Sequence, residues 1–193
     1  MKFCSHCGHP VESRIPAGDN RPRYVCTQCQ TIHYQNPRIV AGTVPVWEGK
    51  ILLCRRAIEP RYGYWTLPAG FMENSETTEE AAARETLEEA MAEVRLAGLY
   101  TMIHVPHIDQ VHMFYLAYLT EPRFGAGEES LETDLFDLDR IPWDEISFPT
   151  VRRTLEHFVE DVQRNEFPLR ISDIRHRMKK PSESSEPQNS SSR

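Results

Sequence analysis

Residues 70–92 read GFMENSETTEEAAARETLEEAMA, and the rest of the chain is interpreted around this stretch. After Glu76 it is rich in Ala and Glu and contains no Pro or Gly until Gly98, which favours a helix. Thr77 and Glu80 have the spacing of a capping box, so we expect the helix to begin there.

Three glutamates of this predicted helix share one face. Glu85, Glu88 and Glu89 stand at positions i, i+3 and i+4. Like charges at this spacing repel one another and destabilise a helix unless something neutralises them. Because Mg²⁺ and Mn²⁺ prefer carboxylate oxygens, the pattern predicts a divalent-cation site. The competing interpretation is a glutamate-rich surface helix.

The spacing resembles the Nudix box, Gly-x5-Glu-x7-Arg-Glu-U-x-Glu-Glu-x-Gly-U, in which U is a bulky aliphatic residue. The matching residues are Gly70, Glu76, Arg84, Glu85, Glu88 and Glu89. Three residues depart from the pattern: Thr86 and Ala92 at the U positions, and Met91 at the second glycine. Glycine is favoured at the end of a helix because it adopts the left-handed conformation readily.

The resemblance implies an α+β fold, the α/β/α Nudix sandwich with a mixed sheet. It also implies a metal-dependent pyrophosphohydrolase that uses Mg²⁺ or Mn²⁺. The implied metal ligands are the carbonyl of Gly70 and the carboxylates of Glu76, Glu85, Glu88 and Glu89. Arg84 would hold the glutamates in place rather than touch the substrate.

Two cysteine pairs precede this region. Cys4-x2-Cys7 and Cys26-x2-Cys29 are separated by 18 residues, a spacing typical of a four-thiolate zinc ribbon. So short a segment cannot bury enough core to fold unaided, so structural Zn²⁺ would stabilise it. Two disulfides or redox-active pairs are the alternatives, and the nearby His6, His9 and His33 could substitute as ligands.

The chain has 193 residues and a formal net charge of −7. No run approaches the roughly 18 apolar residues of a membrane span, so we expect no membrane partner. The acidic balance makes nucleic acid an unfavourable partner, because nucleic-acid-binding proteins usually show a basic face. Met1 leads into Cys4 without an apolar signal segment, so we expect a cytoplasmic protein.

Composition divides the chain into three parts. These are a zinc ribbon at 1–34, a Nudix domain at 35–170 and a mostly disordered C-terminal segment at 171–193. Within the Nudix domain we expect strands at 38–44, 51–56, 94–102, 111–119 and 135–138, a helix at 150–165, and a mobile acidic loop at 121–134.

Candidate substrate contacts lie just before the box. One of Arg55 and Arg56 could bind a phosphate while the other faces solvent. Tyr62 and Tyr64 are candidates for stacking on a base. In several Nudix enzymes a loop glutamate outside the box acts as general base or metal ligand, which makes Glu129 and Glu132 candidates here. The alternative for both is a solvated acidic loop.

A zinc ribbon before a Nudix domain resembles the NADH pyrophosphatase group, but the motif Ser-Gln-Pro-Trp-Pro-Phe-Pro-x-Ser of that group is absent. Tyr34-Gln35-Asn36-Pro37 and Glu129-Ser130-Leu131-Glu132 more closely resemble the plant chloroplast FAD pyrophosphatase. The resemblance implies a small dinucleotide-type substrate, FAD cleaved to AMP and FMN or ADP-ribose, and a homodimer. Alternatives are an NADH or NAD-cap pyrophosphatase, a non-catalytic nucleotide sensor and an RNA-decapping enzyme.

Overall fold

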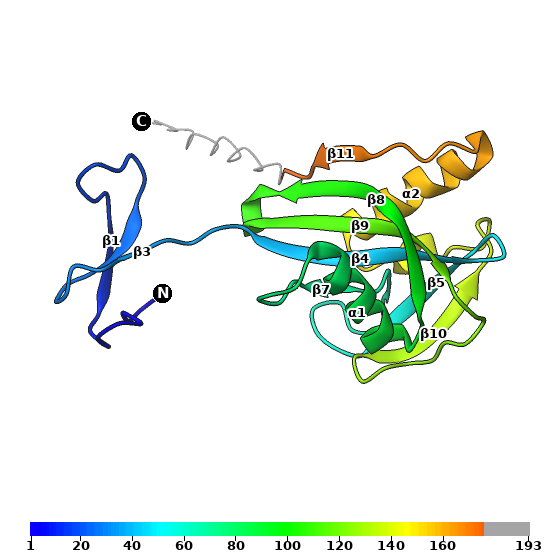
Figure 1. The fold of residues 1–193 in the computed structure, drawn as a ribbon, viewed down its shortest axis with the longest axis horizontal. Helices are drawn as coiled ribbons and strands as arrows, with labels where there is room; N and C mark the ends of the chain where they lie inside the picture. The colour runs from blue at the N-terminus through cyan, green and yellow to red at the C-terminus, as the bar shows by residue number, and fades with distance from the viewer. Residues whose placement is uncertain (176–193) are drawn as a thin grey trace, which may run out of the picture.

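The structure is a computed structural model, and it describes residues 1–175. A small three-stranded sheet forms the N-terminal part, and a larger mixed sheet with two helices forms the rest (Figure 1). The strands of the small sheet are β1 (Val11–Arg14), β2 (Arg23–Cys26) and β3 (Ile32–His33). The residues from 176 onward, where we expected most of the disordered tail, lie outside the described part of the chain.

The main sheet has the strand order β10-β5-β4-β9-β8-β11, with β6 paired to β5 and β7 paired to β4. Its strands are β4 (Arg38–Trp47), β5 (Lys50–Arg56), β6 (Trp65–Thr66), β7 (Ala69–Phe71), β8 (Val94–Val105), β9 (Gln110–Leu119), β10 (Ser130–Phe136) and β11 (Arg170–Asp173). The pairs β4–β9 and β8–β11 are parallel, and the other pairs are antiparallel. The mixed sheet expected from the sequence is therefore confirmed.

Two α-helices pack on opposite faces of this sheet: α1 (Thr78–Ala90) and α2 (Pro149–Arg164). Two short 3-10 helices, η1 (Pro106–Ile108) and η2 (Trp143–Glu145), lie in connections. The capping box predicted for α1 is present, because Thr77 accepts from the amide of Glu80 and the Glu80 carboxylate accepts from the amide of Thr77. None of the helices within residues 1–175 is long and apolar enough to cross a membrane.

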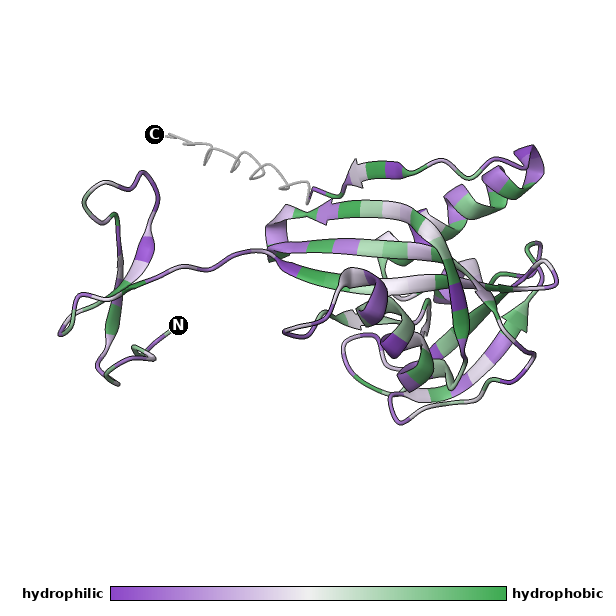
Figure 2. Cartoon of the chain, in the orientation of Figure 1, coloured by the Kyte–Doolittle hydropathy of each residue, from purple (hydrophilic) through white to green (hydrophobic). Residues whose placement is uncertain are grey.

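The alternation of side chains along β9 explains how both helices are held. Phe114 and Leu116 point to one face, where they join a core cluster that includes Leu155 of α2. Tyr115 points to the other face and packs with Ala82 of α1. Figure 2 shows the same alternation of hydrophobic and hydrophilic residues along β8 and β9. Each helix therefore covers the sheet face that carries its apolar partners.

Two sequence expectations need correction. The acidic stretch 121–134 is not a loop throughout, because β10 begins at Ser130 and pairs with β5. The mostly disordered segment that we expected from residue 171 begins with a strand, since Ile171–Asp173 belong to β11. In both cases strand pairing outweighs the local preference of the residues. Met91, where the family pattern places a glycine, ends α1 in the left-handed conformation, with φ 48°.

Candidate active site

The glutamates of α1 are gathered around one arginine. Arg84 donates to Glu76 at 2.8 and 3.0 Å, to Glu85 at 2.8 Å and to Glu88 at 2.9 Å. These side-chain bonds from Arg84, together with the backbone amide of Glu73, lower the pKa of Glu76 to about 2. Arg84 thus holds three box glutamates together, as the resemblance implied.

Glu89 is the most buried of the box glutamates, with 7% of the residue exposed. Burial raises the pKa of Glu89 to about 8, opposed by the amide of Ala69, which donates to its carboxylate at 3.1 Å. Burial also raises the pKa of Glu85. Desolvation is the larger cause for both groups, and the negative charges of neighbouring glutamates add to it, so the charged form of each carboxylate is disfavoured.

The site fits a divalent cation. A Cβ added at Gly70 would lie 2.4 Å from the Glu85 carboxylate, so any larger residue there would displace this carboxylate. The backbone of Gly70 therefore lies against Glu85, and carbonyl and carboxylate oxygens are hard donors that suit Mg²⁺ or Mn²⁺. The residues that would hold the ion are Gly70, Glu76, Glu85, Glu88 and Glu89.

A glycine-containing segment brings a second source of carboxylates to the same place. The amides of Gly125 and Gly127 donate to the carbonyls of Ala90 and Glu89 at 2.8 and 3.1 Å, which satisfies carbonyls at the end of α1. Glu129 lies two residues after Gly127, and its charge contributes to the raised pKa of Glu85 and of Glu89. The segment therefore places Glu129 among the box carboxylates.

The main cavity, of about 920 Å³, contains these carboxylates. Its lining includes the carboxylates of Glu85, Glu88, Glu89, Glu128 and Glu129 and the apolar side chains of Ile58, Ile108, Phe114, Phe148 and Val151. A cavity lined by both charged and apolar groups suits a substrate that joins phosphates to a planar organic group.

The structure separates the predicted substrate residues. Arg56 lines the main cavity and stacks over Phe148, with 5.1 Å from its guanidinium carbon to the ring centroid. Arg55 instead bonds to the carbonyl of Gly63 and to Glu132, with 3.0 Å between Arg55 and the Glu132 carboxylate. This pairing follows from strand register, because Glu132 lies opposite Arg55.

Neither of the two predicted tyrosines is among the residues that line the main cavity. Tyr62 is 54% exposed, and Tyr64 lies under the guanidinium of Arg61 at 5.3 Å. Glu132 and Arg55 are also not among its lining residues. Of the six substrate and loop residues that the sequence suggested, Arg56 and Glu129 are the ones brought to the cavity.

The sequence did not single out three polar residues of the cavity wall. They are Gln110 and His112 of β9 and Thr150 of α2. The Nε2 atom of His112 lies 2.9 Å from Gln110 Oε1, and its Nδ1 atom lies 3.0 Å from Thr150 Oγ1. No local motif marks the set, because Thr150 reaches His112 only when α2 packs on β9.

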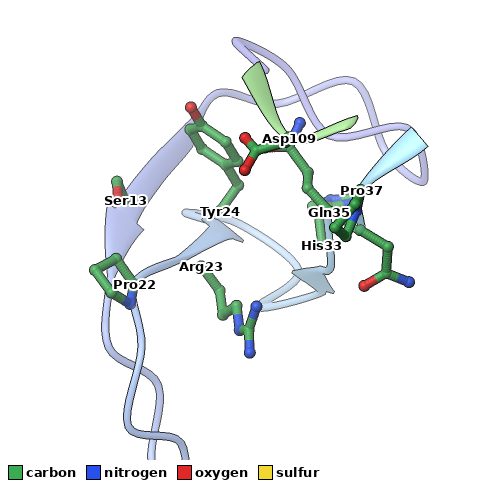
Figure 3. Close-up of a pocket in the computed structure, with 9 residues that line it drawn as sticks. Ser13, Pro22, Arg23, Tyr24, His33, Gln35, Pro37 and Asp109 are labelled. Atoms are coloured by element: carbon green, nitrogen blue, oxygen red, sulfur yellow. The ribbon is translucent and has the colours of Figure 1, made fainter. Parts of the chain in front are cut away.

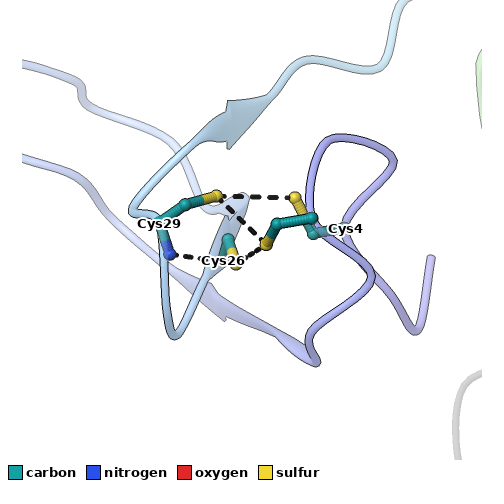
Figure 4. Close-up of side chains that lie close together, drawn as sticks. Cys4, Cys26 and Cys29 are labelled. Atoms are coloured by element: carbon teal, nitrogen blue, oxygen red, sulfur yellow. Dashed lines mark hydrogen bonds between the residues drawn. The ribbon is translucent and has the colours of Figure 1, made fainter.

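In the N-terminal part, four sulfurs lie together. The Sγ atoms of Cys4, Cys7, Cys26 and Cys29 all lie within 4.8 Å of one another, and all four cysteines are free (Figure 4). Separations of 3.4 to 3.7 Å are near the roughly 3.8 Å that tetrahedral Zn–S bonds of about 2.3 Å require. His33 Nε2 lies outside this set, 3.3 Å from Cys4 Sγ. The geometry fits structural zinc, not two disulfides.

A second cavity, of about 280 Å³, lies beside the small sheet (Figure 3). Its lining includes Tyr24 and His33 from β2 and β3, and Asp109 from the turn before β9. None of the Nudix-box residues lines it. The box carboxylates and the apolar side chains described above belong to the main cavity.

A mixed sheet between two helices, with a glutamate-bearing helix facing a large cavity, defines a Nudix hydrolase. The family model described as the NUDIX domain matches residues 36–162, and the one described as Nudix N-terminal, a zinc ribbon, matches residues 2–35. The chain belongs to the Nudix hydrolase family and to its zinc-ribbon-containing subgroup. Enzymes of this family use divalent metals such as Mg²⁺ or Mn²⁺.

Among solved structures, the chain is similar to a NUDIX hydrolase from Nitrosomonas europaea. The two are 50% identical with a TM-score of 0.85, and the match covers 90% of this chain and 100% of that one.

Two curated relatives carry more specific names. The NAD-capped RNA hydrolase NudC of Edwardsiella ictaluri is 31% identical over 163 residues, which are 83% of this chain and 59% of that protein. The ADP-ribose pyrophosphatase of Methanocaldococcus jannaschii is 31% identical over 113 residues, which are 56% of this chain and 67% of that protein. The chain thus spans about three fifths of the NudC protein that it matches.

Proposed function

We propose that this chain is a pyrophosphohydrolase that cleaves the diphosphate of ADP-ribose or an NAD-like compound. The observation that carries the proposal is the main cavity, whose lining combines the box carboxylates with apolar side chains. The carboxylates suit a diphosphate with its metal ions, and the apolar side chains suit a base. The names of the two relatives support this substrate class, because neither names a flavin.

Bound Mg²⁺ or Mn²⁺ would neutralise the diphosphate and acidify a water molecule near neutral pH. The protein's own part is to position the reacting groups and accept a proton. Arg84 keeps Glu76, Glu85 and Glu88 in place through its hydrogen bonds. Glu129 stands beside them on a separate segment, so its carboxylate can accept the proton of the attacking water.

The reaction is a hydrolysis. The water oxygen forms a bond to one phosphorus, the bond from that phosphorus to the bridging oxygen breaks, and the proton passes to the general base. Arg56 lies on the cavity wall, where its guanidinium can bind a phosphate oxygen. The products of ADP-ribose would be AMP and ribose 5-phosphate, and those of FAD would be AMP and FMN.

A product assay tests the proposal. The purified chain with Mg²⁺ or Mn²⁺ is offered ADP-ribose, NADH, NAD⁺, FAD and 8-oxo-dGTP separately, and the products are resolved by chromatography. We expect AMP from ADP-ribose or an NAD compound at the highest rate. Faster release of FMN from FAD would contradict the substrate assignment, and binding without any cleavage would instead make the chain a nucleotide sensor.

The matched variant for this assay is Glu88→Gln. The Glu88 side chain is 57% exposed, so the substitution should leave the fold intact while it removes a carboxylate from the metal site. We expect most turnover to be lost with either cation. A variant that keeps the wild-type rate would show that the metal site is wrongly assigned.

We further propose a homodimer. The resemblance to the Nudix family supports it. Light scattering of the purified full chain tests the proposal: a molar mass near twice 22.4 kDa is expected. A monomeric mass at micromolar concentration would overturn it.

A further inference from the structure

A row of three hydrogen-bonded side chains lies on the wall of the main cavity, away from the box glutamates. His112 of β9 joins Gln110 on the same strand to Thr150 in the first turn of α2. All three residues line the cavity. Thr150 is 3% exposed, so its hydroxyl is fixed by packing as well as by the bond to His112. We call this row the polar relay.

The relay has a direction because His112 is neutral. Burial lowers the pKa of His112 to about 4, so near neutral pH one ring nitrogen donates and the other accepts. With Nε2–H donating to Gln110 Oε1, Nδ1 accepts from the Thr150 hydroxyl. The carboxamide NH₂ of Gln110 is then the next donor of the relay, and its oxygen keeps a second lone pair.

Strand register sets the distance between the relay on β9 and the box carboxylates beside β7. Val40 of β4 pairs with Phe71 of β7 on one side and with His112 of β9 on the other. Neighbouring strands are about 4.8 Å apart, so the row from β7 to β9 spans roughly 10 Å. Gly70, which stands next to Phe71, contacts Glu85. A nucleotide with its diphosphate at the glutamates can therefore reach the relay with its base.

The chemistry of the relay favours a base over a phosphate. It carries no positive charge, so it offers a phosphate little compensation for lost water. Phe114 and Val151 line the cavity beside it and provide an apolar wall for a planar ring. A carboxamide presents a donor and an acceptor side by side, which is the pattern that reads the N6 and ring-nitrogen edge of adenine. In hypoxanthine an oxygen acceptor replaces the N6 donor of adenine, and the neighbouring ring nitrogen N1 carries a proton, so the donor and the acceptor on this edge are exchanged.

We propose that Gln110, held by His112 and Thr150, binds the hydrogen-bonding edge of the adenine base of the substrate. This inference rests on the proposed function, since it assigns the base subsite of the same cavity. Gln110 contacts the base directly, so it determines specificity. His112 and Thr150 act through Gln110, so they are positioning residues.

The test compares adenine with hypoxanthine. ADP-ribose and its inosine analogue are assayed with the full wild-type chain and with Gln110→Met, which keeps the length of the side chain but removes both polar atoms. For Gln110→Met we expect the KM for ADP-ribose to rise roughly tenfold with little change in kcat, which corresponds to one lost hydrogen-bonded contact. The preference for adenine over hypoxanthine should largely disappear.

Two further variants separate binding from structure. Thr150→Val keeps the shape of the side chain but removes the hydroxyl, so it should lower the adenine preference partly. Gln163→Met, on the exposed surface of α2, is the matched control and should change neither constant. The inference would be overturned if Gln110→Met kept the wild-type preference for adenine over hypoxanthine. It would also be overturned if Gln163→Met lost as much of this preference as Gln110→Met.

Calorimetric titration with AMP and with IMP distinguishes this inference from the proposed function. If the wild-type chain cleaves none of the offered dinucleotides, the proposed hydrolysis fails, but the subsite is still tested by binding. Tighter binding of AMP than IMP, lost in Gln110→Met, would support the subsite independently of turnover. Equal affinities of AMP and IMP for the wild-type chain would overturn it.

Discussion

The amide of Ala69 donates to the carboxylate of Glu89 at 3.1 Å, which joins β7 to α1. Within residues 1–175 this is the one hydrogen bond that the Glu89 carboxylate accepts, although the residue is only 7% exposed. One backbone amide does not replace the hydration that a charged carboxylate loses. Glu89 therefore costs the protein stability until a cation binds, and this cost is measurable.

We predict that Glu89→Gln stabilises the protein in the absence of added divalent cations. Glutamine keeps an oxygen to accept from Ala69 and removes the charge that burial disfavours, so the free energy of unfolding should rise by roughly 1–3 kcal/mol. Turnover should be lost. Urea denaturation in metal-depleted buffer measures the first effect, and Glu79→Gln, on the exposed first turn of α1, is the control. Lower stability than wild type would contradict this account.

The departure of Thr86 from the family pattern has a partner in the structure. Its hydroxyl donates to the carbonyl of Ala82 at 2.7 Å and lies 2.7 Å from the hydroxyl of Thr43, and both threonines are fully buried. Thr86→Val leaves the Thr43 hydroxyl without this partner, so we expect a loss of about 1–3 kcal/mol. Thr43→Val/Thr86→Val should cost less than the sum of the single changes. Additive losses in urea denaturation would argue against coupling.

Gly127 lies against the backbone of α1. A Cβ added there would be 1.7 Å from the carbonyl oxygen of Glu88, so Gly127→Ala must displace either the helix end or the segment that carries Glu129. We expect kcat for the preferred dinucleotide to fall at least tenfold. Gly125→Ala is the control, because its added Cβ meets Met91 at an ordinary 3.5 Å. Similar rates for the two alanine variants would show that this close contact does not position the carboxylates.

Removal of zinc should unfold the small sheet. Cys4 and Cys26 are among its few buried residues, so the metal replaces a hydrophobic core there. We expect a zinc chelator to abolish amide protection in residues 1–34, measured by hydrogen exchange, while β4 and β9 stay protected. Restored protection on adding Zn²⁺ is the control. Protection that survives complete removal of zinc would mean that the segment folds by other contacts.

The stability of the fold should depend on the protonation of His112. Its pKa falls from 6.5 in the unfolded chain to about 4 in the fold, so between these values the unfolded state binds more protons. The contribution of the neutral ring is complete above pH 6.5 and decreases as the pH falls toward 4, by at most about 3 kcal/mol.

Comparison with His112→Gln isolates this contribution. The difference in the free energy of unfolding between wild type and variant should shrink from pH 7.5 to pH 4.5 in urea titrations. Other acid-sensitive groups, including the zinc thiolates, are present in both proteins and cancel in the difference. If the difference in the free energy of unfolding between the two proteins stays constant with pH, the pKa of His112 is the same in the fold as in the unfolded chain.

Local patterns predicted the parts of the site that lie close together in sequence. The spacing of Glu85, Glu88 and Glu89 defines one helix face whatever the rest of the chain does, and each Cys-x2-Cys knuckle is equally local. The position of Glu132 could not be derived in this way. Whether it lies in a loop or opposite Arg55 in a strand depends on the register between β10 and β5, which tertiary packing decides.

The polar relay illustrates the same limit. His112 and Thr150 are 38 residues apart, and nothing near either residue indicates that they meet. Met91 shows the opposite case, in which the helix ends where the family pattern predicts although the residue is not glycine. There the contacts that terminate α1 come from Gly125 and Gly127, after two intervening strands.

That arrangement makes the sequence motif a poor module for transplantation. A segment spanning only residues 70–92, moved to another scaffold, would carry its carboxylates but leave behind the amides that satisfy the last carbonyls of α1. A functional graft would have to include the return segment at 125–129 and the spacing that β8 and β9 set between the two.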